Sequence, residues 1–316
     1  MKVIYGISKI KKYKKAVVAL GVFDGVHAGH KNILEGAVRR ARRIKGTSIA
    51  LTFCPHPQKE ESLYSLEHRL RLIKELGISV CIVINFNQNF AHISAADFIK
   101  NILVKKIGTH HIYVGRNFRF GRNAKGDVET LDVFSKMYNF KLKVCDVIKI
   151  KNRAVSSTYI RTLVKNGDLV NAQKLLTRPV SILGTVIKGS SLATKLGFPT
   201  ANIDPHHEVI PPSGVYAVRV IFNTKKFNGA CYIGTKPTFL AQYAIRNTQY
   251  ANIEVNIFNF HKNIYGKKME IQFIRKIREE KKFPSYQFLA AQIQKDVLAV
   301  KKIFSLHSNS PQYMPI

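Results

Sequence analysis

The chain has 316 residues, of which 46% are hydrophobic, so it can form two domains with ordinary cores and is not a wholly disordered protein. No apolar run reaches the length of a signal sequence or a membrane span, which predicts a cytoplasmic protein that does not enter a membrane. The four cysteines include no CxxC pair, which argues against a zinc site or a disulfide framework. The formal net charge of +32 would attract polyanions, yet lysine and arginine are spread along the whole chain, so charge by itself favours no function.

The first informative segment is GVFDGVHAGH, residues 21–30. The apolar run 16–20 before it predicts a buried strand, and apolar residues at helical spacing from Ile33 to Ile44 predict a helix after it. A helix N-terminus offers unpaired N–H groups and partial positive charge to a phosphate. His27 and His30 could donate hydrogen bonds to phosphate oxygens during a group transfer. The candidate substrate contacts here are Gly21, Phe23, Asp24 and Gly29; the alternative is a set of surface residues or a chance metal pair.

Strands and helices then alternate. The predicted strands are 49–53, 80–86, 111–115 and 142–148, and the predicted helices are 66–76, 95–107, 128–138, 158–165 and 168–176. This rhythm predicts an α/β, Rossmann-like domain with a parallel sheet covered by helices on both faces, in which ligands bind beyond the carboxyl ends of the strands. Thr177 to Pro179 is the predicted hinge, which gives a first domain of residues 1–178.

Two loops of this half carry further candidates. The strand exit TFCPHP, residues 52–57, contains Pro55 and His56, and its alternative role is that of a rigid strand end. The segment VGRNFRFG, residues 114–121, contains Asn117 and Arg119. Its two phenylalanines could stack on a ring or could simply pack a turn.

The segment SSTYIR, residues 156–161, begins a predicted helix. Ser156, Ser157 and Thr158 place hydroxyl groups at the helix start, and Arg161 carries a planar fork that matches phosphate oxygens. The alternative is an ordinary N-cap. A triphosphate is bound by more than one group of residues. The presence of both this segment and the histidine pair therefore favours a single nucleotide site to which both contribute.

The second half, residues 179–316, follows a different pattern. Short strands separated by turn residues predict antiparallel β architecture, with strands at 215–222, 230–233, 253–260 and 269–277. Residues 286–304 predict an amphipathic helix, capped by Ser285, that packs on the barrel. Its apolar stripe is Phe288, Leu289, Ile293, Val297 and Val300.

Three segments of this half are candidates for chemistry. GTVIKG, residues 184–189, lacks the Lys-Ser/Thr of a phosphate-binding P-loop, although Gly184, Lys188 and Gly189 stay candidate substrate contacts. In LGFPTAN, residues 196–202, Thr200 and Asn202 lie two apart on a strand and offer oxygen atoms to magnesium. Glu254 lies between apolar residues of a predicted strand, so its side chain points to the opposite face from theirs. It is a candidate for chemistry, and the alternative is a residue that merely faces solvent.

Taken in order, these segments resemble those of bifunctional bacterial riboflavin kinase/FMN adenylyltransferases, also called FAD synthetases. The resemblance rests on the HxGH signature, TFxPHP, VGxDFRFG, an ISSTxIR-like segment and PTAN, and it spans nearly the whole chain. It implies a six-stranded β-barrel that phosphorylates riboflavin with ATP and Mg²⁺, and a nucleotidyltransferase domain that adenylylates FMN to FAD. It implies catalytic roles for His27, His30 and Arg161 at the transferred AMP group, and for Glu254 as the base of the kinase.

The sequence departs from the family pattern at several positions: Asn117 replaces Asp, Tyr159 replaces a basic residue, Ala193 and Thr194 replace Gly-Arg, and Asn259 replaces Asp. The loss of Gly-Arg motivates a first alternative, an FMN adenylyltransferase whose barrel binds flavin without phosphorylating it. A second alternative is a basic nucleic-acid-binding protein, although no recognition signature supports it. The expected partners are ATP, riboflavin and FMN, with no nucleic acid and no membrane; the sequence leaves the oligomeric state open.

Overall fold

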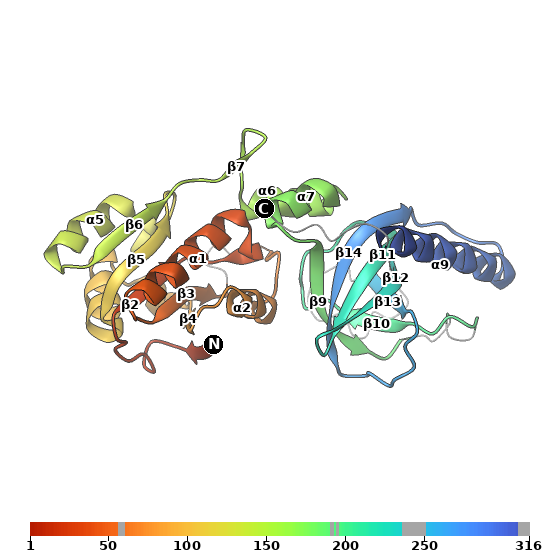
Figure 1. The fold of residues 1–316 in the computed structure, drawn as a ribbon, viewed down its shortest axis with the longest axis horizontal. Helices are drawn as coiled ribbons and strands as arrows, with labels where there is room; N and C mark the ends of the chain where they lie inside the picture. Colours follow the sequence, from red (N-terminus) through yellow and green to blue (C-terminus); the bar gives the residue numbers. More distant parts are fainter. Residues whose placement is uncertain (56–60, 190–192, 194–195, 236–250, 309–316) are drawn as a thin grey trace. The chain divides into compact units, whose positions relative to one another are not determined.

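The computed structural model describes residues 1–55, 61–189, 193, 196–235 and 251–308, and Figure 1 shows its helices and strands. The chain forms two compact units. The N-terminal unit comprises 1–160 and 175–177, and the C-terminal unit comprises 161–174 and the chain from Arg178 onward. The contacts thus place the segment 161–174 with the second unit, and the functional domain boundary at residue 178 stays a prediction.

A parallel sheet of six strands forms the centre of the N-terminal unit. Its order is β1-β4-β3-β2-β5-β6, built from Lys2–Tyr5, Val80–Asn85, Ser48–Cys54, Ala16–Leu20, Thr109–Gly115 and Lys141–Cys145. Every residue of β2 is buried, as expected of a central strand whose two faces are both covered. The predicted strands are all present; β1, a short strand at the edge, was not predicted.

Helices cover this sheet (Figure 1). They are η1 (Asp24–Val26), α1 (Ala28–Arg43), α2 (Leu66–Glu75), α3 (Gln88–Ala91), α4 (Ala95–Asp97), η2 (Phe98–Ile107), η3 (Arg122–Ala124) and α5 (Val128–Met137). The helix predicted at 95–107 is the α-helical turn α4 followed by the π-helical stretch η2. A hairpin of β7 (Lys149–Ile150) and β8 (Arg153–Ala154) precedes α6 (Ser157–Lys165) and α7 (Leu169–Leu176).

The C-terminal unit contains a closed antiparallel barrel of six strands. Its strands are β9 (Val180–Ile187), β10 (Ala201–Asp204), β11 (Gly214–Phe222), β12 (Lys225–Thr235), β13 (Ala251–Ile257) and β14 (Lys268–Arg278). Around the barrel the order is β10-β13-β12-β11-β14-β9. Each strand of the closed barrel pairs with a neighbour on both sides, and inward residues such as Val218, Ile233 and Val255 fill the interior.

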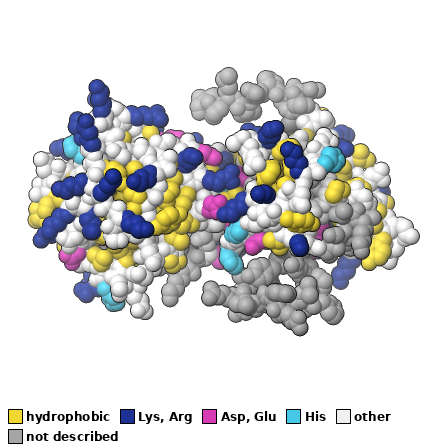
Figure 2. Space-filling view, turned by 90° about the horizontal axis from the view of Figure 1, so that it is seen from below, with side chains coloured by type: hydrophobic (Ala, Val, Ile, Leu, Met, Phe, Trp, Pro, Cys, Tyr) yellow, Lys and Arg dark blue, Asp and Glu magenta, His cyan; other side chains and the backbone are white. Residues whose placement is uncertain are grey.

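Charged side chains are distributed widely on the surface. On the visible face, lysine and arginine lie scattered and do not form a single patch (Figure 2). Among the described residues, no helix combines the length and apolar character needed to cross a bilayer. All four cysteines are free thiols.

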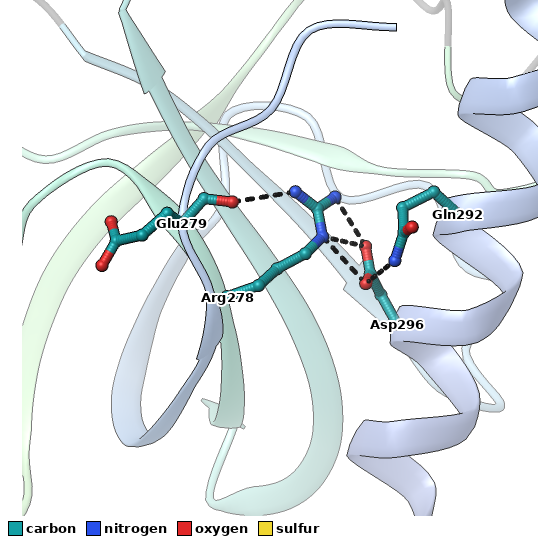
Figure 3. A network of polar contacts seen from close by, with 4 residues as sticks. All are labelled: Arg278, Glu279, Gln292 and Asp296. Atoms are coloured by element: carbon teal, nitrogen blue, oxygen red, sulfur yellow. Dashed lines mark hydrogen bonds and ion pairs between the residues drawn. The ribbon is translucent and has the colours of Figure 1, made fainter.

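The helix α9 (Tyr286–Ser308) packs on the barrel through its later turns. Val300 and Phe304 are buried there against Ala217 of β11. The buried carboxylate of Asp296 accepts hydrogen bonds from Nε and Nη2 of Arg278, at 3.0 and 2.8 Å, and one from Gln292 (Figure 3). Phe288, predicted to belong to the buried stripe, is 63% exposed. That part of the prediction is wrong because burial on α9 begins further along the helix, as the positions of Asp296, Val300 and Phe304 show.

Candidate active sites

The loop between β2 and α1 lies where the order of the N-terminal sheet changes direction. From β2 the chain adds β3 and β4 on one side, and it then returns to place β5 on the other side of β2. In open α/β sheets, ligands bind outside the carboxyl ends of the strands at such a switch point. Gly21 follows β2 and Arg116 follows β5, so the loop 21–30 occupies the expected ligand position.

An unusual backbone shapes this loop. Phe23, Gly25 and Val26 have φ angles of 55°, 75° and 38°, in a region that non-glycine residues rarely adopt. Asp24 holds the turn in place: its carboxylate, 1% exposed, accepts the backbone N–H of Leu63 at 2.9 Å and that of Tyr64 at 3.2 Å. The structure therefore gives Asp24 an anchoring position in the loop, and its predicted substrate contact stays a prediction.

Two further residues of the loop also act through packing. The side chain of Phe23 is fully buried and meets the ring of His30 edge-on, with the ring centroids 5.4 Å apart. A Cβ on Gly21 would lie 2.8 Å from the Phe23 ring, so only glycine fits there. Gly21 and Phe23 thus shape the loop that carries the histidines, and their predicted substrate contacts stay predictions.

The two histidines lie together at the start of α1. Their rings are stacked, with centroids 3.6 Å apart and planes inclined by 16°. Nδ1 of His27 accepts the backbone N–H of His30 at 3.3 Å and so caps the helix. Because Nδ1 is an acceptor, a neutral His27 carries its proton on Nε2, which is then a donor. A Cβ on Gly29 would approach His27 to 3.2 Å, so this glycine makes room for the ring.

A buried arginine connects this loop to the exit of β3. Nη1 of Arg69, on α2, donates to the carbonyl oxygen of Val22 at 2.7 Å, and Thr52 donates to the same oxygen at 2.7 Å. Burial lowers the pKa of Arg69, and the nearby Asp24 opposes this shift. Pro55 follows a cis peptide bond at the end of β3, and His56 lies outside the described residues.

The segment after β5 contributes packing and one exposed ion pair. Phe120 belongs to the hydrophobic core and Phe118 packs against it, with the two rings 5.6 Å apart, so the turn-packing alternative describes them. Nη1 of Arg119 donates to Asp127 at 2.7 Å. Hydrogen bonds from Thr130 to Asp127, together with Arg119, lower the pKa of this carboxyl. Asn117 is exposed at the carboxyl end of β5, where a ligand can reach it.

The start of α6 serves both the helix and the loop. Ser156 accepts the backbone N–H of Tyr159 at 3.3 Å, which is the capping role of the simpler alternative. Ser157 donates to the carbonyl oxygen of Asp24 at 2.9 Å and so links α6 to the histidine loop. Thr158 is exposed. Arg161 is 9% exposed and begins the segment assigned to the C-terminal unit, so its predicted role beside the histidines stays a prediction.

In the C-terminal unit, two glycines allow segments to approach closely. A Cβ on Gly184 would lie 2.3 Å from Ile203 and 2.6 Å from the carbonyl oxygen of Asp204, so Gly184 lets β9 and β10 pack closely. Its predicted substrate contact stays a prediction. A Cβ on Gly189 would lie 2.0 to 2.4 Å from the amide group of Asn202. Gly189 therefore keeps space for a side chain predicted to bind a nucleotide. Lys188 is exposed next to it.

A hydrogen-bonded polar group surrounds Glu254. Its Oε2 accepts from Thr200 Oγ1 at 3.1 Å, and its Oε1 accepts from the side chain of Asn252 at 2.7 Å. Asn202 pairs with Glu254 across β10 and β13, and Tyr232 pairs with it across β12 and β13. Its neighbours Ile253 and Val255 are buried in the barrel, whereas Glu254 is half-buried on the other face. The predicted Thr200, Asn202 and Glu254 thus come together from β13 and from the segment that contains β10.

The donor set of this group suits magnesium. It consists of a hydroxyl, an amide and a carboxylate, the oxygen ligands that a hard cation prefers. Within the residues that the structure describes, no cluster of three or more His, Cys, Asp or Glu side chains has metal-binding geometry. Mg²⁺ commonly shares its coordination between protein oxygens and nucleotide phosphates.

Sequence reasoning missed three residues that support these sites: Arg69, Asn252 and Arg153. Arg153 stacks on the Tyr159 ring, 5.3 Å from its centroid, and donates to its hydroxyl at 3.0 Å. Arg69 contacts residues far away in sequence, whereas Asn252 and Arg153 contact Glu254 and Tyr159, two and six residues further along the chain. The motif patterns did not single out any of these contacts.

Comparison with known proteins gives matches in both units. Residues 9–159 match a family model described as FAD synthetase, and residues 176–304 match one described as riboflavin kinase. A solved structure of a Streptococcus pneumoniae protein, named a macrolide-efflux protein, has a TM-score of 0.80 and 27% identity. It covers 94% of this chain and 97% of its own.

Curated relatives match along nearly the full length. A bifunctional riboflavin kinase/FMN adenylyltransferase of Buchnera aphidicola subsp. Schizaphis graminum is 36% identical, covering 97% of this chain and 100% of its own. The protein of the same name from Bacillus subtilis is 36% identical, covering 92% and 93%. With matches of this extent in both units, the chain belongs to the family of bifunctional riboflavin kinases/FMN adenylyltransferases.

Proposed function

We propose that the C-terminal unit phosphorylates riboflavin to FMN and that the N-terminal unit adenylylates FMN to FAD, each with ATP as co-substrate. The observation that carries this proposal is that each unit has its own polar site. One is the pair of stacked imidazoles at the start of α1, and the other is the hydrogen-bonded group around Glu254. Two separate sites match two different reactions, one at the terminal phosphate of ATP and one at its α-phosphate.

In the kinase reaction, Glu254 accepts the proton of the riboflavin 5′-hydroxyl as that oxygen attacks the γ-phosphorus of ATP and ADP leaves. The side chain of Asn252 orients one carboxylate oxygen, and the hydroxyl of Thr200 holds the other. Thr200 and Asn202 bind Mg²⁺ together with the ATP phosphates. Bound magnesium supplies charge neutralisation on the transferred phosphoryl group.

In the adenylylation, a phosphate oxygen of FMN attacks the α-phosphorus of ATP, and the bond to pyrophosphate breaks. Nε2 of His27 and the ring of His30 donate hydrogen bonds to the oxygens that gain negative charge. The N-terminus of α1 adds backbone N–H groups of its first turn. Ser156, Ser157, Thr158 and Arg161 hold the outer phosphates, and Asn117 and Arg119 lie on the β5 side of the same site. Gly29 keeps the space that the His27 ring occupies.

One assay separates the two reactions. The protein is incubated with riboflavin, ATP and Mg²⁺, and riboflavin, FMN and FAD are resolved over time; FMN replaces riboflavin in a parallel reaction. Glu254→Gln should abolish FMN formation and leave FMN adenylylation intact. His30→Ala should abolish FAD formation while FMN accumulates.

Matched controls are available in each unit. Glu279→Gln removes an exposed carboxylate from the C-terminal unit, and His92→Ala removes an exposed histidine from the N-terminal unit; both should retain both activities. Retention of both activities by Glu254→Gln and His30→Ala would show that these residues are wrongly assigned. Wild-type protein that makes FAD from FMN but leaves riboflavin unphosphorylated would support the adenylyltransferase-only alternative. The cytoplasmic location stays part of this proposal.

A further inference from the structure

A cationic groove lies on the N-terminal unit between α1 and the strands β5 and β6, with a volume of about 740 Å³. Five positively charged side chains line it: Arg39, Arg40, Arg43, Lys141 and Lys143. Arg40 follows His30 by ten residues on α1, which is about 15 Å along a helix. The charged part of the groove is therefore separate from the candidate adenylylation site.

The groove lies over the part of the sheet, at β5 and β6, that α1 does not fully cover. α1 rests on β2, β3 and β5, and Gly36 lets it approach Tyr113, since a Cβ there would lie 2.9 Å from the ring. Lys141 and Lys143 pair with His111 and Tyr113 in parallel register, so all four side chains lie on the same face. Such faces are usually apolar and covered by a helix. An alternative role for Lys141 and Lys143 is to prevent the edge strand β6 from pairing with another chain. That role does not explain the three arginines of α1 that face them.

A buried histidine positions one of these arginines. Nε of Arg40 donates to Nε2 of His111 at 2.8 Å, and His111 is 5% exposed. Burial, with the positive charges of Arg40 and Lys141 and the neighbouring His110, lowers the pKa of His111 to about 4. His111 is thus a neutral acceptor at pH 7, and the two terminal nitrogens of Arg40 are left to bind another group.

The groove holds little negative charge of its own. Among the described residues, no carboxylate lies within ion-pair distance of Arg40, Arg43, Lys141 or Lys143. Glu35 is 3.6 Å from Arg39, and Asp146, at one end of the groove, is paired with Arg116 at 2.6 Å. Like charges in a shared groove repel one another unless an anion joins them.

We propose that this groove binds a small anion that carries two or more linked phosphate groups. Guanidinium groups match phosphate oxygens in a bidentate manner, and the groove has the volume of a small-molecule site. Tyr113 and Val147 add an apolar wall on which a ring attached to the phosphates can rest. The proposal does not depend on either flavin reaction.

Hydrogen exchange with mass spectrometry tests the site on the full-length protein, with inorganic tripolyphosphate as the probe in buffer free of divalent ions. Tripolyphosphate should slow exchange in residues 141–148. Lys141→Glu/Lys143→Glu should remove this protection and raise the Kd, measured by calorimetry, by about tenfold or more. Lys9→Glu/Lys11→Glu, which changes the charge of the same unit by the same amount at exposed positions, should keep the protection. Both flavin activities should be unchanged in the groove variant.

Three results would overturn the proposal: no protection of 141–148, an equal loss of affinity in Lys9→Glu/Lys11→Glu, or protection by an RNA strand but not by tripolyphosphate. Loss of FMN adenylylation in the groove variant would contradict the separation of the two sites. Circular dichroism checks that each variant is folded. Should the double variant fail to fold, Arg43→Ala, which removes one exposed cation, is expected to weaken the same binding.

Discussion

At the scale of the residue, glycines matter to the two sites because their missing side chains leave space for neighbouring groups. Gly189 and Asn202 illustrate this, because the position of a Cβ at residue 189 is already occupied by the Asn202 amide. A methyl group there must displace the amide, and Asn202 is one of the two residues proposed to bind Mg²⁺ and ATP. Gly189 thus acts on the kinase site by leaving room for another side chain.

Gly189→Ala should therefore lower the kcat/KM of FMN formation for ATP by about tenfold or more, equivalent to about 1.4 kcal/mol of transition-state stabilisation. The rate of FAD formation from FMN should not change, because that site lies in the other unit. Steady-state kinetics with riboflavin and with FMN measure both effects. An unchanged kcat/KM for ATP in FMN formation would mean that the position of Asn202 is not important for the reaction.

The sequence indicates the identity of many site residues better than their roles. It predicts the histidine pair, Thr200 and Glu254, and the structure brings each of these groups together. It does not distinguish a side chain that contacts substrate from one that supports the loop beneath it. Asp24 and Gly184 lie within motif-like segments, yet one binds backbone N–H groups and the other lets two strands approach. Such roles depend on partners far away in sequence.

At the scale of the element, the charged pair of Arg278 and Asp296 (Figure 3) joins α9 to the barrel. Apolar contacts of Val300 and Phe304 add to this attachment. The Asp296 side chain is 6% exposed and that of Arg278 is 21% exposed, so the pair is largely removed from water. Each partner depends on the other, because an isolated buried charge is costly.

Asp296→Ala should destabilise the C-terminal unit by about 3 kcal/mol, since it leaves Arg278 without its main partner. Heat should then abolish FMN formation at a lower temperature than in the wild type, while FAD formation from FMN keeps its wild-type inactivation temperature. Asp132→Ala, which breaks an exposed pair with Lys136 on α5, is the control and should cost less than about 1 kcal/mol. Equal inactivation temperatures for FMN formation in Asp296→Ala and wild type would contradict the argument.

Secondary structure is predicted well where burial alone determines it. The apolar run 16–20 is β2 in full, and the four strand ranges predicted in the second half overlap β11, β12, β13 and β14. β9 was not among the predicted ranges. β1 was missed because its alternating pattern covers four residues at the edge of the sheet. The closure of the barrel and the π-helical course of η2 depend on the register of neighbouring segments, which hydrophobic spacing does not encode.

At the scale of the whole molecule, the dominant property is charge. The chain carries 51 lysines and arginines against 19 aspartates and glutamates, and Figure 2 shows the positive side chains dispersed over the visible face. Folding brings these charges closer together, so their mutual repulsion opposes the compact state. Local pairs such as Arg119 with Asp127 offset only a small part of it, because exposed pairs contribute little.

Added salt should therefore stabilise this protein. The Debye length falls from about 30 Å at 0.01 M to about 8 Å at 0.15 M ionic strength, so repulsion between distant charges is screened across this interval. We expect the Tm to rise by about 4 °C between these two NaCl concentrations, which corresponds to about 1 to 2 kcal/mol. Lys9→Glu/Lys11→Glu lowers the net charge from +32 to +28 without changing a buried residue, so its Tm should depend less on salt. Calorimetry of both proteins measures the two slopes. A Tm that falls with NaCl, or a variant slope steeper than that of the wild type, would show that specific ion pairs outweigh general repulsion in determining stability.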